Sequence, residues 1–238
     1  MKFAPLLLPL MLAIALPAHA QMAEKAEALP FATPDLMVPA ALLPTPPAPD
    51  TPLGQAELAM VRLAGQHATP ERRAMADKDG QTENVTFFAD TIPGFDVSKL
   101  PATKKLFDDI GTEEDVTTKA YKSYFARKRP YQVDPTIQTC PSEKTTTKPN
   151  SYPSGHTTTG FAMGVILADL IPEKAQAILD RAKIYAENRV ICGVHFPYDT
   201  VAGQSLGTAL AVEMLQDANF RQELAAARKE LIAAGITH

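Results

Sequence analysis

The sequence predicts an all-α fold, in which a proline-rich N-terminal arm precedes a single compact helical domain. From Gly54 onward, apolar residues recur at helical spacing in one segment after another. Only the short segment from Asn84 to Ala89 shows the alternation of a strand. The chain is long enough for one ordinary domain and short for two. The expected division is residues 1–20 as a signal peptide, 21–53 as the arm and 54–238 as the domain.

The first twenty residues have the pattern of a secretory signal peptide. Lys2 precedes an apolar stretch, and Ala18-His19-Ala20 supplies the small residues of a cleavage site before Gln21. A transmembrane anchor is the alternative. It is disfavoured because the apolar run is shorter than the ~20 residues of a bilayer span and contains three prolines: Pro5, Pro9 and Pro17. We therefore expect a periplasmic or secreted protein with no membrane anchor after cleavage.

The charge balance of the chain argues against general electrostatic binding to polyanions. Loss of Lys2 reduces the basic residues from 23 to 22, against 27 acidic residues, for a net charge near −5. A weakly acidic protein has no general attraction for nucleic acid or for anionic membrane. No nucleic-acid partner is expected, and any anion site must be local.

The arm and the domain differ in local composition. Eight prolines between Pro30 and Pro52 favour an extended arm, and its interspersed apolar residues favour packing against the domain. Thr112, followed by three acidic residues, has the pattern of a helix N-terminus. A polar loop from Pro130 to Pro153 is of the length that often carries function. Helices are expected over about 54–66, 101–110, 112–128, 156–170, 172–188, 195–215 and 219–234.

The two cysteines, Cys140 and Cys192, are predicted to form a disulfide. In an exported protein two cysteines usually pair, although two buried free thiols are the alternative. The bridge would close a loop of about fifty residues, for which the chain-entropy model gives on the order of 4 kcal/mol of stabilisation.

Two clusters of residues could bind an anion. Lys122 and Arg129 are seven residues apart, close to two helical turns, so both cations are expected on one face near a helix end. At the start of a later helix, Ser154 and His156 offer hydrogen-bond donors, and Gly155 permits close approach to the free N–H groups. Each cluster has a simpler interpretation: a solvated basic face for the first, and a serine that only caps the helix for the second.

A third cluster contains Arg189, His195 and Asp199. A carboxylate four residues after His195 can accept a hydrogen bond from one ring nitrogen and leave the other as a nucleophile. The alternative is an ordinary His–Asp pair on a helix surface.

Together and in this order, the clusters resemble the acid phosphatase superfamily that includes type 2 phosphatidic acid phosphatases and vanadium-dependent haloperoxidases. The family pattern is Lys, six residues, Arg-Pro; then Pro-Ser-Gly-His; then Ser-Arg, five residues, His, three residues, Asp. Asn188 stands where the pattern usually has Ser. The segments NVTFFAD, LPATKKLF, SYPSGHTTTGFA and RVICGVHF look like the bacterial class A non-specific acid phosphatases, whose fold is a helix bundle.

The resemblance implies a role for each motif residue. His195 attacks phosphorus and forms a phosphohistidine, Asp199 orients His195, and His156 protonates the leaving group and later activates water. The phosphoryl oxygens are held by Lys122, Arg129, Ser154, Gly155 and Arg189.

Several functional expectations follow from this resemblance. Substrates should be small phosphate monoesters, with an alcohol able to replace water as a phosphoryl acceptor. We expect neither a cofactor nor a catalytic metal. Vanadium-dependent haloperoxidase activity and a non-catalytic phosphate-binding module are the alternatives, while a membrane lipid phosphatase would need several spans. Whether the protein forms a homo-oligomer is left open.

Overall fold

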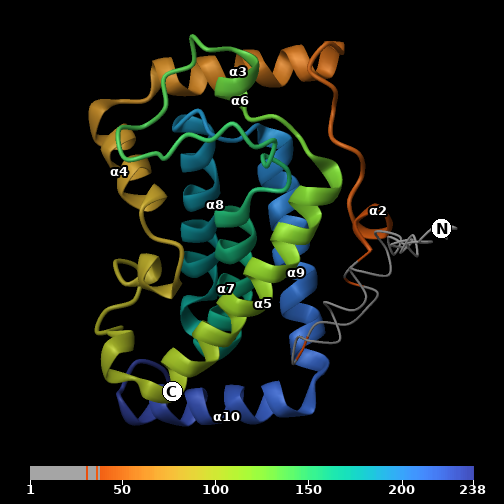
Figure 1. Cartoon of the computed structure of the whole chain (residues 1–238). Helices are drawn as coiled ribbons and strands as arrows, with labels where there is room; N and C mark the ends of the chain where they lie inside the picture. Colours follow the sequence, from red (N-terminus) through yellow and green to blue (C-terminus); the bar gives the residue numbers. More distant parts are fainter. Residues whose placement is uncertain (1–30, 32–35, 37) are drawn as a thin grey trace, which may run out of the picture.

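The computed structural model describes residues 31, 36 and 38–238 (Figure 1). The expected signal peptide lies outside the described residues. Within them every regular element is helical, which confirms the all-α class. The α-helices are α2 Pro39–Leu42, α3 Pro52–His67, α4 Pro70–Gly80, α5 Pro101–Phe125, α6 Pro130–Val133, α7 Gly155–Leu170, α8 Ala175–Ile191, α9 Pro197–Gln216 and α10 Ala218–Ala233. Three 3₁₀ turns are η2 Val85–Phe88, η3 Val97–Lys99 and η4 Pro172–Lys174.

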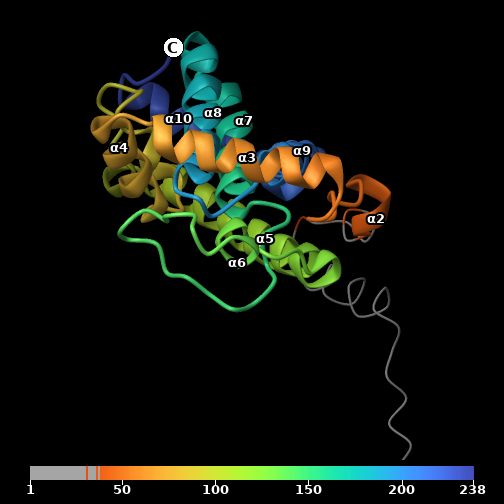
Figure 2. The same ribbon diagram turned by 90° about the horizontal axis from the view of Figure 1, so that it is seen from above.

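A bundle of α5, α7, α8 and α9 forms the body of the molecule, with α3 across one end and α10 across the other (Figure 1). Helix α7 packs against α5, α8, α9 and α10. It is apolar around most of its circumference, as a central helix must be. Figure 2 views the bundle from the end that α3 crosses, where the loop between α6 and α7 projects to one side. No helix among the described residues is long and apolar enough to cross a bilayer.

Helix α9 lies unusually close to the first turns of α7. A Cβ at Gly203 would be 2.7 Å from the carbonyl oxygen of Ser154, and one at Gly207 would overlap the backbone of Thr158. Only glycine permits this approach. The backbone N–H of Ser154 donates to the carbonyl oxygen of Asp199 at 3.0 Å. The start of α7 and the start of α9 are therefore held in fixed register.

Helix α5 differs from the two helices that the sequence predicted. The hydroxyl of Thr112 donates to the carbonyl oxygen of Asp108 at 3.0 Å, within one continuous helix, and so does not cap a new one. The helix also ends before Lys128, because Ala126 adopts a left-handed conformation with φ of 46°. Pro130 then disfavours a helical conformation at the residue before it.

Two further expectations need correction. The segment from Asn84 to Ala89 is the 3₁₀ turn η2, in which the Asn84 side chain accepts from the backbone N–H of Thr86 at 3.0 Å. Adjacent Phe87 and Phe88 are both buried, so no strand alternation survives. Helix α4 was not expected, although Thr69 caps it just as Thr51 caps α3, each followed by proline at the first helical position.

The described residues of the arm pack against the bundle. Phe31, Leu36 and Leu43 are buried in the main core. The hydroxyl of Tyr121 donates to the carbonyl oxygen of Leu36 at 2.6 Å, and that of Tyr152 donates to the carbonyl oxygen of Pro44 at 2.8 Å. Tertiary hydrogen bonds thus hold the described part of the arm, in which α2 is a helix of only four residues.

The predicted disulfide between Cys140 and Cys192 is present, with a Cα–Cα distance of 4.8 Å. It joins the loop after α6 to the end of α8. This link brings the loop over the end of the bundle where the motif residues meet.

Candidate active site

Motif residues from five segments meet at the end of the bundle beneath the α6–α7 loop. They come from the end of α5, the segment after it, the start of α7, the end of α8 and the turn into α9. A cavity of about 530 Å³ lies among them. Its lining residues are Gly80, Gln81, Glu83, Lys122, Arg129, Ser142, Glu143, Lys144, His156, Arg189 and His195.

His195 is buried at the turn between α8 and α9. Gly193 forms this turn with φ of 69°, and a Cβ there would lie 2.6 Å from the Ile137 side chain. The backbone N–H of His195 donates to the carbonyl oxygen of Arg189 at 3.3 Å. The ring nitrogen Nδ1 faces Asp199 Oδ2 at 3.3 Å, as the four-residue spacing predicted.

The surroundings of the His195 ring define its neutral tautomer. Arg129 Nη1 can only donate, and it lies 3.3 Å from Nε2. The Asp199 carboxylate can only accept, so the proton belongs on Nδ1 and the lone pair on Nε2. Burial, followed by the charge of Arg129, lowers the pKa of His195 well below its usual range, although Asp199 opposes this. The ring is therefore neutral, and the lone pair of Nε2 faces Arg129.

Asp199 is held by more than the histidine. Its side chain accepts from the Ser151 hydroxyl at 2.6 Å and from the Phe196 N–H at 2.9 Å, and it pairs with Arg127 Nη1 at 2.6 Å. Burial raises the pKa of Asp199, but His195, Arg127 and Ser151 outweigh it and lower the value to about 2. The carboxylate that orients His195 stays ionised.

Arg127 is a supporting residue that the sequence did not single out. Its guanidinium is buried between Asp199 and Glu57, whose Oε2 lies 2.7 Å from Nη2, and stacks over Phe196 at 4.1 Å. Glu57 also accepts from the N–H of Tyr198 at 2.7 Å, which fixes the first turn of α9. A buried, doubly paired arginine is a tertiary feature, whereas its sequence neighbours gave only the pattern of a basic surface.

Arg129 reaches the cavity by a different route from the expected one. It follows the end of α5, so it does not share a helix face with Lys122. Its Nε donates to Asn150 Oδ1 at 2.9 Å and its Nη1 to the carbonyl oxygen of Val194 at 3.2 Å. These contacts turn the side chain back toward His195.

Arg189 is 2% exposed, and its Nη2 lies 2.7 Å from Glu143 Oε1. Its Nε and Nη1 are buried without a hydrogen-bond partner among the described residues. These nitrogens are free donors at the cavity wall.

Gly155 leaves room for the side chain of Lys122, the third cation of the motifs. A Cβ at this position would lie 3.1 Å from Lys122 Nζ and 3.2 Å from Glu83 Oε1. The ammonium of Lys122 and the carboxylate of Glu83 thus lie against the first residue of α7. Burial and then Arg129 lower the pKa of Lys122, while Glu83 and Glu114 raise it.

His156 faces acceptors through both ring nitrogens. Nε2 lies 3.1 Å from the carbonyl oxygen of Gly80, and Nδ1 lies 3.1 Å from Glu83 Oε1. Because neither partner can donate, the doubly protonated imidazolium satisfies both. His156 lines the same cavity as the neutral His195.

The chain is similar to known proteins over most of its length. A model of the PAP2 superfamily matches residues 113–223. An acid phosphatase of Zymomonas mobilis is 31% identical over 220 residues, which cover 90% of this chain and 81% of that protein. The chain belongs to the PAP2 superfamily.

Further PAP2 relatives carry similar names. Non-specific acid phosphatases of Salmonella typhimurium and Providencia stuartii are each 29% identical to this chain. The matches cover 79% and 80% of this chain, and 78% and 79% of those proteins, respectively. The predicted resemblance to acid phosphatases is thereby confirmed. A transmembrane PAP2-type phosphatidylglycerolphosphate phosphatase from Bacillus subtilis superposes with a TM-score of 0.48 at 19% identity, over 75% of this chain and 89% of that one.

Two residues of the PAP2 pattern have structural contacts here. Ser154 is buried as the N-cap of α7, and its hydroxyl oxygen lies 3.0 Å from the Thr157 hydroxyl. Asn188, at the position of the usual serine, donates to Asp79 Oδ2 at 2.6 Å. Asp79 also binds Arg181 through both carboxylate oxygens. The asparagine therefore joins α8 to α4.

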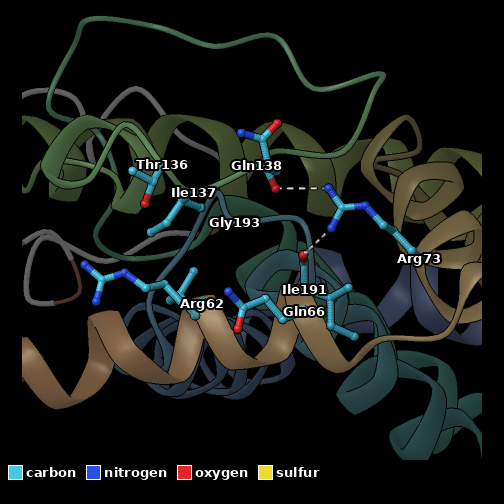
Figure 3. Close-up of a pocket in the computed structure, with 10 residues that line it drawn as sticks. Arg62, Gln66, Arg73, Thr136, Ile137, Gln138, Ile191 and Gly193 are labelled. Atoms are coloured by element: carbon cyan, nitrogen blue, oxygen red, sulfur yellow. Dashed lines mark hydrogen bonds between the residues drawn. The ribbon is translucent and has the colours of Figure 1, made fainter.

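A second cavity, of about 290 Å³, is lined by other residues of the PAP2 protein (Figure 3). Arg73 reaches across it from α4 to the carbonyl oxygens of Gln138 at 3.0 Å and Ile191 at 3.4 Å. Arg62 pairs with Asp134 at 2.6 Å. Both guanidinium groups are bound by the protein, and Arg73 ties α4 to the two segments next to the disulfide.

In the part of the chain that the structure describes, no three or more His, Cys, Asp or Glu side chains converge in a way that could hold a metal ion. The ionisable groups that line the cavity of about 530 Å³ are mainly lysine, arginine and histidine side chains.

Proposed function

We propose that this protein is an exported, metal-independent acid phosphatase that hydrolyses phosphate monoesters through a phosphohistidine on His195. One observation carries the proposal. A buried, neutral imidazole, with Nδ1 toward Asp199, presents Nε2 at a cavity that is also lined by the three motif cations and a second histidine. A module that only bound phosphate would not need this nucleophile.

The three cations account for phosphoryl binding. Lys122, Arg129 and Arg189 line the cavity, and Arg189 has two free buried nitrogens. Fixed positive charge on the equatorial oxygens is the main source of catalysis in phosphoryl transfer. The cations would perform here the work that Mg²⁺ performs in other phosphoryl-transfer enzymes.

The reaction proceeds in two steps. His195 Nε2 attacks phosphorus and forms a P–N bond as the P–O bond to the leaving group breaks, and His156 donates its proton to the departing alkoxide. His156 then accepts a proton from water, whose oxygen attacks phosphorus as the P–N bond breaks. Inorganic phosphate leaves and His195 is restored. An alcohol in place of that water gives phosphotransferase activity.

The two histidines should give activity at mildly acidic pH. The lowered pKa of His195 keeps its ring neutral in mild acid. His156 must carry a proton for the first step. Activity is therefore expected to persist at mildly acidic pH and to fall at alkaline pH, where the proton that the first step requires becomes scarce.

An exported location is supported by the sequence of residues 1–20 and by the disulfide. Disulfides persist mainly in oxidising compartments such as the periplasm. Sequencing the N-terminus of the protein recovered from a bacterial periplasmic fraction tests this expectation. A chain in that fraction that begins at Gln21 supports export, whereas a chain that is found only in the cytoplasmic fraction, with an intact N-terminus, contradicts it.

The activity is tested with p-nitrophenyl phosphate in EDTA, using the native protein, His195→Ala and the control His67→Ala. His67 is exposed at the end of α3, outside the cavity. The native protein and the control should hydrolyse the ester, while the kcat of His195→Ala should be lower by about a thousandfold or more. Labelled phosphate should remain on the native protein after an alkaline quench and be absent from His195→Ala.

Other outcomes would decide against the proposal. Activity lost in EDTA and restored by a divalent ion would contradict metal independence. A folded His195→Ala variant with substantial turnover would remove His195 as the nucleophile. Phosphate affinity without turnover in the native protein would favour a binding module.

A further inference from the structure

Glu83 is a charged residue of the cavity to which the catalytic steps assign no task. It lies in the segment between α4 and η2, and its Oε1 is 3.1 Å from His156 Nδ1. Its side chain is 48% exposed and lines the cavity. The carboxylate is therefore both a partner of the proton donor and open to a bound molecule.

The position of Glu83 relates it to the leaving group. In the proposed reaction His156 protonates the leaving oxygen, so the leaving group must lie beside the His156 ring. The other His156 nitrogen faces the carbonyl oxygen of Gly80, a neutral acceptor. Glu83 is thus the only charged group paired to this ring among the described residues.

The carboxylate keeps its charge throughout the working pH range. Burial raises the pKa of Glu83, but the hydrogen bond from His156 and the charges of His156, Lys122 and Arg189 together lower it to about 2. A fixed negative charge therefore faces the place where the leaving group lies.

Two other charged residues line the cavity apart from the phosphoryl-binding cations and Glu83. Glu143 pairs with Arg189 at 2.7 Å and so belongs to the phosphoryl side. Lys144 is exposed and is not a partner of the His156 ring, whose two nitrogens face Gly80 and Glu83. Of the two carboxylates that line the cavity, Glu83 is thus the one on the His156 side.

We propose that Glu83 determines specificity for the leaving group of the monoester, and selects phosphate esters of amino alcohols over esters whose leaving group carries a second anion. The proposal rests on the phosphatase activity proposed above. An ammonium a few ångströms from the ester oxygen would be attracted to the carboxylate, and a carboxylate or second phosphate there would be repelled. At a separation of about 6 Å and intermediate screening, the interaction between two unit charges corresponds to a change of roughly tenfold in kcat/KM.

The test compares two esters of matched length: 2-aminoethyl phosphate, with an ammonium, and 2-phosphoglycolate, with a carboxylate. The ratio of their kcat/KM values is measured for the native protein and for Glu83→Gln, with p-nitrophenyl phosphate as the reference. The native protein should favour the ammonium ester. Glu83→Gln should reduce that preference by about tenfold or more. Loss of the negative charge should lower kcat/KM for the ammonium ester and raise it for the carboxylate ester. The ratio cancels any general loss of activity.

Glu143→Gln is the matched control because it removes one carboxylate charge from the same cavity, on the phosphoryl side. Its activity is expected to change, but its ratio between the two esters should stay near the native value. An equal change of ratio in Glu143→Gln would overturn the assignment to Glu83. So would an unchanged ratio in an active Glu83→Gln.

If Glu83→Gln is folded but inactive, a binding measurement tests the proposal instead. The non-hydrolysable analogues 3-aminopropylphosphonate and 3-phosphonopropionate keep the same two end groups. Calorimetry should show a preference for the ammonium analogue in the native protein that Glu83→Gln loses, and equal preference in both proteins would contradict the proposal. Failure of the native protein to hydrolyse any of the three esters would count against the phosphatase activity itself, and the phosphonate ratio would still report on Glu83.

Discussion

Arg127 shows how a single residue can support the site without facing the cavity. Arg127 and Lys128 are adjacent basic residues, and the sequence does not distinguish them. After the left-handed turn at Ala126, Arg127 points into the protein and is 7% exposed, whereas Lys128 lies on the surface. Its guanidinium bridges Asp199 and Glu57. The orientation of His195 therefore depends on a buried ion pair one step removed from the chemistry.

Substitution of Arg127 by methionine should strongly destabilise the protein. Arg127→Met leaves two buried carboxylates without their cation, and loss of one partner from a buried pair costs about 3–5 kcal/mol. The exposed control Lys128→Met should change the free energy of unfolding by less than about 0.5 kcal/mol. Urea unfolding of both variants measures the difference, and equal stabilities would contradict a supporting role for Arg127.

His195 should make stability depend on pH. Burial and Arg129 depress its pKa, so below the unfolded pKa of about 6.5 the unfolded chain binds a proton that the native state refuses. Its contribution is fully present above that pH and is lost as the pH falls, by up to about 1.4 kcal/mol per unit. His195→Gln cannot titrate, so its stability should fall less than that of the native protein between pH 7 and pH 5. Parallel curves from urea unfolding would show that His195 does not titrate in this way.

At the scale of elements, the contact between α7 and α9 determines the geometry of the site. Ser154 begins α7 and Asp199 lies in the first turn of α9, and a backbone hydrogen bond of 3.0 Å joins them. The approach requires Gly203 and Gly207, which have no side chain to separate the helices. The start of α7 and the first turn of α9, which follows His195, are thereby held close together.

Two glycine-to-alanine substitutions should have opposite effects. In Gly203→Ala the new methyl group would lie 2.7 Å from the Ser154 backbone and force α9 from α7, with a cost of about 1–3 kcal/mol and reduced activity. In Gly111→Ala, in α5, the methyl group would meet only the Met163 side chain, at 3.6 Å. The higher helix propensity of alanine should then stabilise the protein by about 0.5–1 kcal/mol. Thermal and urea unfolding would contradict this account if both substitutions had the same effect.

At the scale of the whole molecule, long-range links close the structure over its active end. The disulfide holds the α6–α7 loop to the end of α8, and Glu143 on that loop pairs with Arg189 of α8. The arm is tied to the bundle through the hydroxyls of Tyr121 and Tyr152. Glu230 of α10 accepts from the backbone N–H groups of Ala102 and Thr103 at the opposite end.

Removal of the disulfide should cost stability throughout the domain. The two cysteines are 52 residues apart, and opening such a loop in the double variant Cys140→Ser/Cys192→Ser should reduce the free energy of unfolding by about 4 kcal/mol. Urea unfolding measures the loss, and a reducing agent should destabilise the native protein but leave the double variant unaffected. A thiol titration of the unfolded, unreduced native protein should find no free thiol; two free thiols would contradict the bridge.

The sequence by itself determined the features that depend on local order. Pro101 and Ser154 marked the starts of α5 and α7, and spacing alone predicted that His195 would reach Asp199. The order of the three motifs identified the family, and the two cysteines predicted their disulfide. These features require only residue type and short separation along the chain.

Only the tertiary structure decided which charges serve the site. Arg127 was one of several adjacent cations, Arg129 was expected on a helix that ends before it, and neither Glu57 nor Glu83 belonged to a motif. Their roles arise from contacts between segments far apart in the chain, such as the 72 residues that separate Arg127 from Asp199. A charge can be buried only where its partner is already placed, and that placement is a property of the packed bundle.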